Sequence, residues 1–521
     1  MRRSRFAGIG RLVRRFDNRG NVAIVAALAM GPICVAGLGA VDLARATNAK
    51  AELQDALDAA ALASARTTST TDAQLKTAGD RFLAQNLSLG DDFKLGTTSF
   101  KFGQNGNVVA SASLEVRPFV AGLLSNGVIS IEATSEVVRA SVKVEIALVL
   151  DTTGSMNDGT KLADMKKAAK DFVTKMEEAA NKSVEPDSVK ISLVPFSNTV
   201  RVDGAAYLNA PWVDQAGASP INDEIFTKAS GTQHANRLTL FSQIGTAWRG
   251  CVEMRKAPYD VQDTAPSTGT PATLYTPYFA PDEPDSKTSG YSDDYENDYL
   301  PDGTGSTTNW RVKQGSITKY GGTKRGSMST TFGPNRGCGV SKMRRLSTSF
   351  QAIRDDIQAL TADGNTNIPI GMSWGWNTLS PQGPFADGVA YNTPKHQKIL
   401  VLMTDGENTI STRDTPNDGT YAGTAYIWQG RVIKSNGQPL SNGVNNDTRT
   451  QALDYRLGLL CTNMKAKNIE IYTIRVEAGS STLLQNCASS RDNFYNVTNS
   501  STLTAVFASI AGQIAALHLA R

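Results

Sequence analysis

Five oxygen-bearing side chains stand at three separate places in the chain, and their chemistry suits a divalent cation. Asp151, Thr153 and Ser155 lie in the segment DTTGS, Thr366 lies in GNTNIPIG, and Asp405 lies in LMTDGEN. Hydroxyl and carboxylate oxygens are preferred by a hard ion such as Mg2+, which takes oxygens in an octahedral arrangement and retains some waters. We therefore predict a Mg2+ site, with Mn2+ and Ca2+ left open as alternatives.

Two of these segments follow apolar runs that predict buried parallel strands. VEIALVL at 144–150 leads into Asp151, and KILVLM at 398–403 leads towards Asp405. In an open α/β sheet, the loops that leave the carboxyl ends of the strands face one crevice. Residues about 250 positions apart in the chain are therefore expected to meet there.

Strand and helix patterns alternate from residue 141 to residue 521. Further strands are predicted at 189–196, 469–476 and 494–497, and helices at 161–180, 345–360, 368–379, 447–467 and 503–519. This alternation predicts a doubly wound, mainly parallel α/β sheet. The helix that begins near Lys161 offers Ser155 an ordinary alternative role, as its N-cap.

Two long stretches interrupt this pattern and are predicted to be insertions that rim the crevice. They cover about 198–342, rich in Pro, Gly, Tyr and Asp, and 407–446, rich in Gly, Asn and Thr. Within the first, residues 281–310 combine aromatic residues with the acidic run SDDYENDYLPD at 292–302. The spacing of this run matches no EF-hand loop, which favours a solvated acidic loop over a calcium site. Its aromatic residues are expected either to form a contact surface or to pack the insertion.

The N-terminus has the charge pattern of a membrane anchor. Residues 1–19 contain seven arginines and one aspartate, although the net charge of the whole chain is only +4. Residues 20–41 carry no charge, and a helix of that length is about 33 Å long, so we predict a transmembrane helix at 20–42. The basic tail is then a cytoplasmic topology signal and not a nucleic-acid site. Cleavage of a signal peptide at Ala44-Arg45-Ala46 is the alternative.

Residues 43–140 are predicted to form a small separate domain. The helical pattern continues outward from the membrane span to about residue 66, and a second helix is predicted at 71–87. Three segments between 93 and 141 alternate apolar and polar residues, which predicts an antiparallel sheet. A long helix with a small α+β head has a layout similar to pilin-like proteins.

The cysteines agree with export of the C-terminal part. Cys34 lies inside the apolar span, and the other four are even in number and form no C-x-x-C motif. We expect structural disulfides between Cys251 and Cys338 and between Cys461 and Cys487, because each pair brackets one segment. The sequence alone allows three connectivities, and free thiols are the other possibility.

The three oxygen-bearing motifs, in this order, resemble the metal-ion-dependent adhesion site of von Willebrand factor type A domains. By that resemblance, Thr153, Ser155 and Thr366 reach the ion through their hydroxyls, and Asp151 and Asp405 act mostly through bound waters. The first hydroxyl here is Thr where the family pattern has Ser or Thr. The resemblance implies that residues 141–521 form a von Willebrand factor type A domain with large insertions.

Nearly the whole chain is similar to the TadG-like proteins of the tight-adherence (Flp) pilus system. The similarity is carried by RGNVAIVAALAM, DLARATNAKAELQDALDAAALA, the three metal motifs and a closing CASSRDNFYNVTNSSTLTAVFASIAGQIAAL. One departure concerns pilin processing, because Val25 stands five residues after Gly20 where processed type IV pilins have Glu. Cleavage after Gly20 is therefore not expected.

These observations predict a membrane-anchored module that binds a protein partner in pilus assembly or surface adhesion. An ion held by hydroxyls and water-bridged carboxylates stays electrophilic and accepts an acidic side chain of the partner. The expected location is the bacterial inner membrane, with residues 1–19 in the cytoplasm and the C-terminal domain periplasmic or at the surface. The alternatives are a structural minor pilin whose metal only rigidifies loops, and a metal-dependent hydrolase with Glu407 as its general base.

Overall fold

The chain folds into two compact units, Met1–Arg139 (unit 1) and Ala140–Arg521 (unit 2). A computed structural model describes residues 19–519 apart from 68, 70, 89, 91, 104–106, 119–127, 139–141, 184, 227–234 and 304–307. The predicted basic tail lies outside the described residues, except for Arg19, which opens the first helix.

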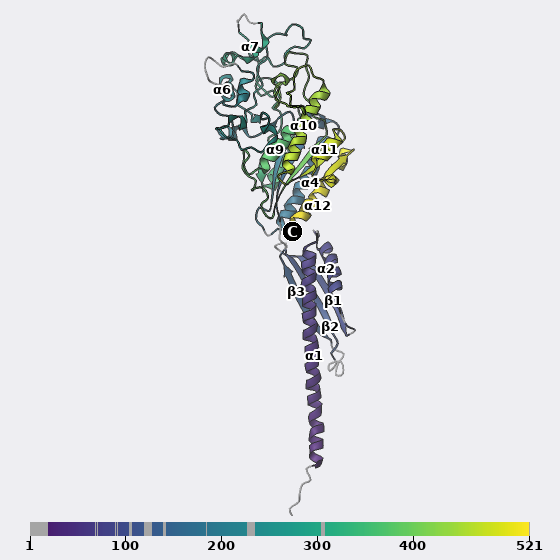
Figure 1. Cartoon of the computed structure of the whole chain (residues 1–521). Helices are drawn as coiled ribbons and strands as arrows, with labels where there is room; N and C mark the ends of the chain where they lie inside the picture. Colours follow the sequence, from purple (N-terminus) through teal and green to yellow (C-terminus); the bar gives the residue numbers. More distant parts are fainter. Residues whose placement is uncertain are drawn as a thin grey trace, which may run out of the picture. The chain divides into compact units, whose positions relative to one another are not determined.

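Unit 1 joins a long helix to a small antiparallel sheet (Figure 1). Its elements are α1 (Arg19–Ala65), α2 (Asp72–Asn86), β1 (Phe93–Phe102), β2 (Val108–Val116) and β3 (Ile129–Val137), with the strands in the order β1-β2-β3. Leu53 and Leu57 of α1, Leu75 and Leu83 of α2, and Phe100 of β1 are all buried in one core. The sheet has the expected antiparallel pairing, and the helical pattern runs unbroken from the apolar span into this core.

The N-terminal part of α1 has no such packing. Val25, Leu28, Met30 and Ile33 are each more than half exposed. The segment Val25–Ala65 is long and apolar enough to cross a membrane, and so is Ser500–Leu517 near the C-terminus. The latter segment is largely the core helix α12, whereas only 6% of the apolar window in α1 is buried, so α1 is the better candidate for a span.

Unit 2 contains the predicted doubly wound, mainly parallel α/β sheet (Figure 1). Its strands are β4 (Lys143–Asp151), β5 (Val189–Phe196), β8 (Arg344–Ser347), β9 (His396–Thr404), β10 (Ile469–Val476) and β11 (Phe494–Val497), in the order β11-β10-β9-β4-β5-β8. Its main helices are α4 (Lys161–Asn181), α8 (Phe350–Gln358), α9 (Ile368–Leu379), α10 (Asn446–Lys465), α11 (Ser481–Cys487) and α12 (Leu503–Leu519). Every strand pair is parallel except β5 with β8. The fold class predicted from the sequence is confirmed.

The central strand β4 separates two hydrophobic cores because successive side chains of a strand point to opposite faces. Ala147 and Val149 face the core that contains α9 and α10. Ile146, Leu148 and Leu150 face the core that contains α4, α8 and α12. Burial on both faces explains why this strand is apolar from Ile146 to Leu150.

The helix predicted at 345–360 is wrong in its first part. Residues Arg344–Ser347 form β8, which pairs with the edge of β5, and the helix α8 begins only at Phe350. The hydroxyl of Ser347 accepts a hydrogen bond from the backbone N–H of Ser349 at 3.0 Å, which turns the chain between the two elements. The run of Ser and Thr residues at 347–349 therefore marks a turn, not a helix interior.

The two insertions are packed structures. The first contains the two-stranded sheet of β6 (Val200–Arg201) and β7 (Cys251–Val252) and the short helices α5 (Gly204–Tyr207), α6 (Arg237–Ile244) and α7 (Trp310–Gly315). Its aromatic residues join the α9 side of the sheet in one core; Phe279, Tyr299 and Tyr320 are fully buried there. Of the two roles expected for the aromatic residues of 281–310, packing therefore applies to Tyr299.

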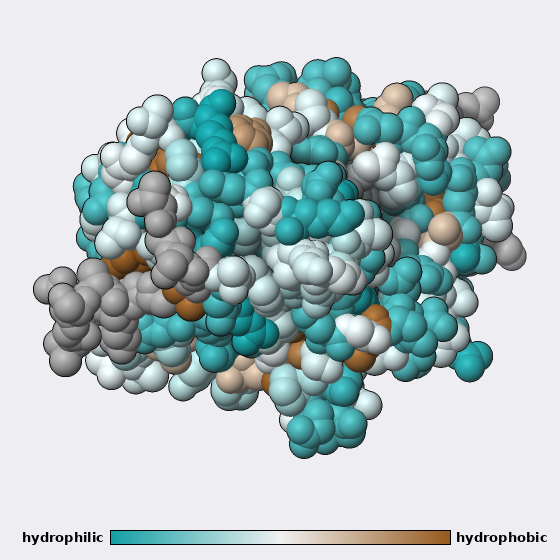
Figure 2. Space-filling view, turned by 90° about the horizontal axis from the view of Figure 1, so that it is seen from above, coloured by the Kyte–Doolittle hydropathy of each residue, from teal (hydrophilic) through white to brown (hydrophobic). Residues whose placement is uncertain are grey.

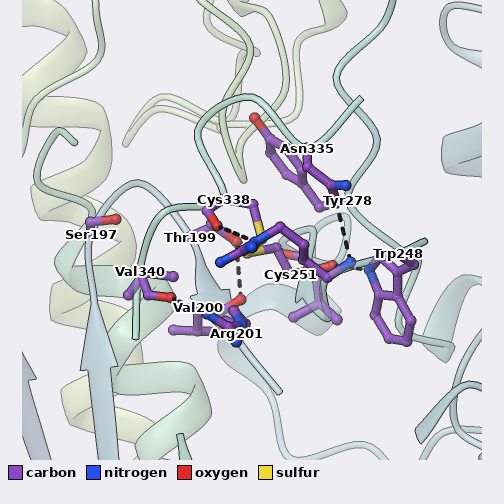
Figure 3. The surroundings of a disulfide bond; sticks show 12 residues. Ser197, Thr199, Val200, Arg201, Trp248, Cys251, Tyr278, Asn335, Cys338 and Val340 are labelled. Carbon is purple, nitrogen blue, oxygen red and sulfur yellow. Dashed lines mark hydrogen bonds between the residues drawn. A yellow bond between two sulfur atoms is a disulfide. The ribbon is translucent and has the colours of Figure 1, made fainter. Parts of the chain in front are cut away.

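Two disulfides fasten unit 2, with the pairing expected from the sequence. Cys251 is bonded to Cys338, 87 positions apart, and Cys461 is bonded to Cys487, 26 positions apart. Figure 3 shows the first bond, where the indole N–H of Trp248 donates to the carbonyl of Cys251 at 2.7 Å. The bond ties β7, inside the first insertion, to the end of that insertion.

Removal of the Cys251–Cys338 bond by Cys251→Ala with Cys338→Ala is expected to lower the free energy of unfolding of unit 2 by about 4–5 kcal/mol, because it closes the longer loop. Removal of the Cys461–Cys487 bond is expected to cost about 1 kcal/mol less. Urea unfolding followed by tryptophan fluorescence measures both, since all six tryptophans lie in unit 2. Equal losses would show that loop length does not govern these bonds.

Candidate metal centre

The ends of β4 and β9 bring the predicted site residues together. The hydroxyl of Ser155 donates a hydrogen bond to Oδ1 of Asp405 at 2.7 Å, across 250 positions of sequence. The hydroxyl oxygens of Thr153 and Ser155 are 3.1 Å apart. Ser155 is not the N-cap of α4, because the cap position is Thr160 and Ser155 lies in the 3-10 turn Gly154–Asn157. The cap alternative for Ser155 is therefore wrong.

Backbone hydrogen bonds attach the Thr366 loop to both neighbouring loops. On one side, the N–H of Gly154 donates to the carbonyl of Gly364 at 2.9 Å. On the other side, the N–H of Thr409 donates to the carbonyl of Thr366 at 2.8 Å, and the Thr409 hydroxyl accepts from the N–H of Thr366 at 3.0 Å. Asn367 caps the buried helix α9, so Thr366 is held between the helix start and the two strand ends.

Gly406 shows how close these side chains come. A Cβ atom added to Gly406 would lie 3.4 Å from Oγ1 of Thr366 and 3.9 Å from Oγ of Ser155. Both hydroxyls therefore border the same small space beside Gly406. A larger residue at this position would fill part of it.

Asp151 is the most deeply buried group of the site, with 0% exposure. Its Oδ1 accepts from the N–H of Thr153 at 2.8 Å, and its Oδ2 accepts from the hydroxyl of Thr404 at 2.6 Å. Burial, followed by the negative charge of Asp405, raises the pKa of Asp151 to about 6. Two carboxylates are thus held near each other inside the protein, an arrangement that a cation would relieve.

Lys161 is the cation that the protein itself places at the site. Its Nζ lies 3.0 Å from Oδ2 of Asp405 and 3.7 Å from Oε2 of Glu477, and its side chain is only 12% exposed. Burial opposes the charge of Lys161, but its hydrogen bond to Asp405 and the nearby acidic charges outweigh this and raise its pKa. The ammonium of Lys161 therefore faces the carboxylates of Asp405 and Glu477.

The donor set fits a hard divalent cation. Among the residues that the structure describes, no three His, Cys, Asp or Glu side chains lie together as a metal-binding group. The oxygens gathered here are of a different kind, two carboxylates with the hydroxyls of Thr153, Ser155 and Thr366, and they suit Mg2+ better than a softer ion.

Sequence reasoning missed three contributors to this arrangement. Thr404 orients Asp151, Lys161 pairs with Asp405, and Gly406 leaves the space open. Thr404 and Gly406 flank Asp405 in the motif LMTDGEN, so their positions in the sequence could have identified them as part of the site. Lys161 carried no signal, because a lysine at the start of an amphipathic helix is normally a solvated residue.

Two side chains bear on the hydrolase alternative. Glu407, the suggested general base, is exposed. His396 is at the start of β9, and a strand of that length, at about 3.3 Å per residue, puts it roughly 26 Å from the site end of the strand.

The acidic run at 292–302 is not a freely solvated loop, and this expectation needs correction. Glu296 pairs with Arg336 and Arg413, and Asp298 lies 3.1 Å from the guanidinium of Arg325. Asp302 is 3% exposed at its side chain and pairs with Lys313 and Lys319. Arginine and lysine side chains distant in sequence neutralise these carboxylates, and the run alone could not reveal them.

Several solved structures match the chain at low similarity. Proximal thread matrix protein 1 from the mussel byssus is 12% identical, with 73% of this chain and 47% of that chain covered and a TM-score of 0.29. The pilus adhesin SpaC from Lactobacillus rhamnosus GG is 14% identical over 82% of this chain and 36% of that chain, with a TM-score of 0.33. The chain therefore spans about half or less of those two proteins.

A third structure is matched over most of its length. The vWF domain of the type V pili tip protein Mfa5 from Porphyromonas gingivalis is 12% identical, with 72% of this chain and 96% of that chain covered and a TM-score of 0.33. Similarity at this level says nothing about what the present chain binds. No curated protein sequence matches the chain.

A family model matches the N-terminal segment of the chain. Residues 20–67, which cover most of α1, match the family described as putative Flp pilus-assembly TadE/G-like. The same segment carries the uncharged span and the alanine-rich helix on which the prediction from the sequence depended. The resemblance to TadG-like proteins of the Flp pilus system is confirmed by this match at the N-terminal segment.

Proposed function

We propose that unit 2 binds a divalent cation at the Asp151–Asp405 cluster and uses it to bind a protein partner in Flp-type pilus assembly or surface adhesion. The observation that carries this proposal is the contact of Ser155 with Asp405 beside Asp151, at the ends of two neighbouring parallel strands. Thr153, Ser155 and Thr366 would hold the ion through hydroxyl oxygens, and the two aspartates through water. Mg2+ suits this donor set best, and Mn2+ and Ca2+ share its preference for oxygen.

The chemistry that the ion supplies is an electrophilic position for an acidic group. Neutral hydroxyl ligands leave most of the ion's charge unneutralised, so an aspartate or glutamate of the partner becomes an attractive further ligand. The face of the chain seen in Figure 2 is mainly hydrophilic, with hydrophobic residues in small separate patches. That face shows no large apolar docking surface among its described residues.

The proposed location follows from α1 and the disulfides. The exposed apolar part of α1 would span the bacterial inner membrane, with the arginine-rich tail in the cytoplasm. Unit 2 would then be periplasmic or at the cell surface, an oxidising location that suits its two disulfides.

The test compares the full-length chain with its Ser155→Ala variant, each incubated with or without EDTA before cross-linking and purification. We expect natural protein to retain partners only when divalent cation is present, and Ser155→Ala to retain at least tenfold less. Thr174→Ala, which removes an exposed hydroxyl of α4, is the matched control and should retain partners normally. Partner recovery that is insensitive to both EDTA and Ser155→Ala would disprove a metal-bridged contact.

Two alternative functions predict different results when the same protein is tested. A purely structural metal predicts that EDTA lowers the unfolding temperature of unit 2 and leaves partner recovery unchanged. A metal-dependent hydrolase predicts turnover of a generic phosphoester or peptide that disappears in Glu407→Ala.

Lys161→Met is expected to tighten Mg2+ binding by about tenfold, equal to about 1.4 kcal/mol. The ammonium of Lys161 contacts Asp405 and repels an incoming cation, so its removal frees the carboxylate and lowers the repulsion. Isothermal titration with MgCl2 at fixed ionic strength measures the change. Lys166→Met, one turn further along α4 and at the surface, serves as the control for loss of a positive charge. Weaker binding by Lys161→Met would mean that Lys161 supports the site by holding Asp405.

A further inference from the structure

The two insertions of unit 2 meet at a cavity separate from the cluster of metal-site oxygens. The cavity has a volume of about 620 Å3 and is lined by residues of three loops, at 291–293, 412–418 and 442–443. Its walls include Tyr291, Arg413, Asp414, Thr415 and Asp418. The acidic and aromatic segment of the first insertion, whose role the metal site leaves unexplained, forms one of these walls.

Hydrogen bonds between the insertions hold the walls in place. Asp414 Oδ2 accepts from the backbone N–H of Ser292 at 2.7 Å and from its hydroxyl at 2.5 Å. In return, the N–H of Asp414 donates to Asp293 Oδ2 at 2.9 Å, and Arg413 pairs with Glu296. The loops at 291–293 and 412–418 are therefore pre-organised against each other, which reduces the entropy lost when a ligand binds.

One buried polar group at the cavity has no protein partner. Thr415 is 4% exposed, and among the described residues its hydroxyl makes no hydrogen bond. A buried hydroxyl without a hydrogen-bond partner destabilises the folded protein.

The charges around the cavity are largely balanced within the protein. Arg449 lies 2.9 Å from Asp418, and Arg413 lies 3.9 Å from Asp293. The described residues contain no group of three acidic, His or Cys side chains that would hold a metal ion here. This balance favours a neutral, hydroxyl-rich ligand over a basic peptide or a metal ion.

We propose that the cavity binds a neutral saccharide. The carboxylate of Asp414 and the side chain of Asn442 can exchange hydrogen bonds with sugar hydroxyls, and bonds to a carboxylate are the stronger kind. Tyr291 is 38% exposed, so its ring offers an apolar surface to the C–H face of a sugar ring. The volume lies within the ordinary range of small-ligand sites, about 300–1,000 Å3, and the polar walls exclude an apolar ligand. The cavity contains none of the proposed metal ligands, so binding should not depend on divalent cation.

The test uses the full-length chain in detergent, a glycan array, and saturation-transfer NMR with glucose, galactose, mannose and N-acetylglucosamine. We expect at least one saccharide to bind, with a dissociation constant on the order of 1 mM for a single sugar, and equally well in EDTA. Tyr291→Ala and Asp414→Asn should each weaken binding at least tenfold. Asp187→Asn, at an exposed position outside the cavity, should bind like the natural chain.

Unfolding followed by tryptophan fluorescence shows whether each variant remains folded, and Thr415→Val supplies a third variant that changes only a hydroxyl. Failure of the natural chain to bind any saccharide would overturn the proposal. So would saccharide binding that survives both Tyr291→Ala and Asp414→Asn, or displacement of the sugar by poly-lysine at low concentration, which would identify a basic ligand.

Discussion

The Asp151→Asn protein is expected to bind Mg2+ about 10–100-fold more weakly than the natural chain and yet to unfold at a higher temperature without metal. The first effect follows because a water-bridged carboxylate loses its charge. The higher unfolding temperature follows because Asp151 is buried beside Asp405. Burial and the negative charge of Asp405 together raise the pKa of Asp151 from 3.8 to about 6. At pH 7.5 the charged side chain therefore destabilises the folded protein by about 1–3 kcal/mol, which asparagine avoids.

The stability difference between Asp151→Asn and the natural chain should depend on pH, and this dependence serves as a control. The penalty from ionised Asp151 is fully present above pH 6 and disappears as the pH falls below 3.8, so the advantage of asparagine should shrink on acidification. The amide oxygen of asparagine can keep the hydrogen bond from the N–H of Thr153, and its NH2 group can donate to the hydroxyl oxygen of Thr404, so the fold should be retained. Asp171→Asn, at the surface of α4, is the matched control. Unchanged Mg2+ affinity in Asp151→Asn would remove this residue from the site.

Glu253→Ala is expected to destabilise unit 2 by about 3–5 kcal/mol. The carboxylate of Glu253 is fully buried and contacts three partners, the guanidinium groups of Arg237 and Arg431 and the hydroxyl of Tyr421. Arg431 belongs to the second insertion and the other two charged groups to the first, so the network joins the insertions. Removal of Glu253 leaves two buried arginines with too few acidic partners. A buried charge without its partner is strongly destabilising.

Urea unfolding monitored by tryptophan fluorescence measures this loss. Lys342→Ala is the control and breaks the ion pair between Lys342 and Asp203. The two side chains are 48% and 38% exposed, so its loss should lower the free energy of unfolding by less than about 1 kcal/mol. A double-mutant cycle with Arg431→Leu separates the pair energy from the cost of the remaining unpaired charge. A loss for Glu253→Ala as small as that for Lys342→Ala would mean that the network does not support the insertions.

The regular part of the fold could be predicted from the sequence because local pattern and burial agree there. β4 and β9 each contain a continuous apolar run, at 146–150 and 399–403, as buried parallel strands do, and the prediction for α9 matches its observed bounds. The helix expected at 345–360 failed at its start, because β8 is a short edge strand whose pairing with β5 is a long-range contact. The packed insertions were read as loops for the same reason, since partners such as Arg413 and Glu296 lie 117 positions apart.

For the candidate site, the sequence could predict the residue types and their positions after the strands, but not every contact between their side chains. Asp151, Ser155 and Asp405 were expected to meet because parallel strands end at one edge, and the structure places Ser155 against Asp405. The pairing of Lys161 with Asp405 could not be predicted, because it depends on where the first turn of α4 passes the end of β9. Assignment of these residues as metal ligands stays a prediction.

Anomalous diffraction from crystals of unit 2 grown with MnCl2 tests the central claim most directly. We predict one strong manganese peak within coordination distance, about 2.2 Å, of the hydroxyl oxygens of Ser155 and Thr366, with Asp405 reaching it through water. Absence of a peak between these oxygens at saturating Mn2+, with Lys161 still bound to Asp405, would contradict the account.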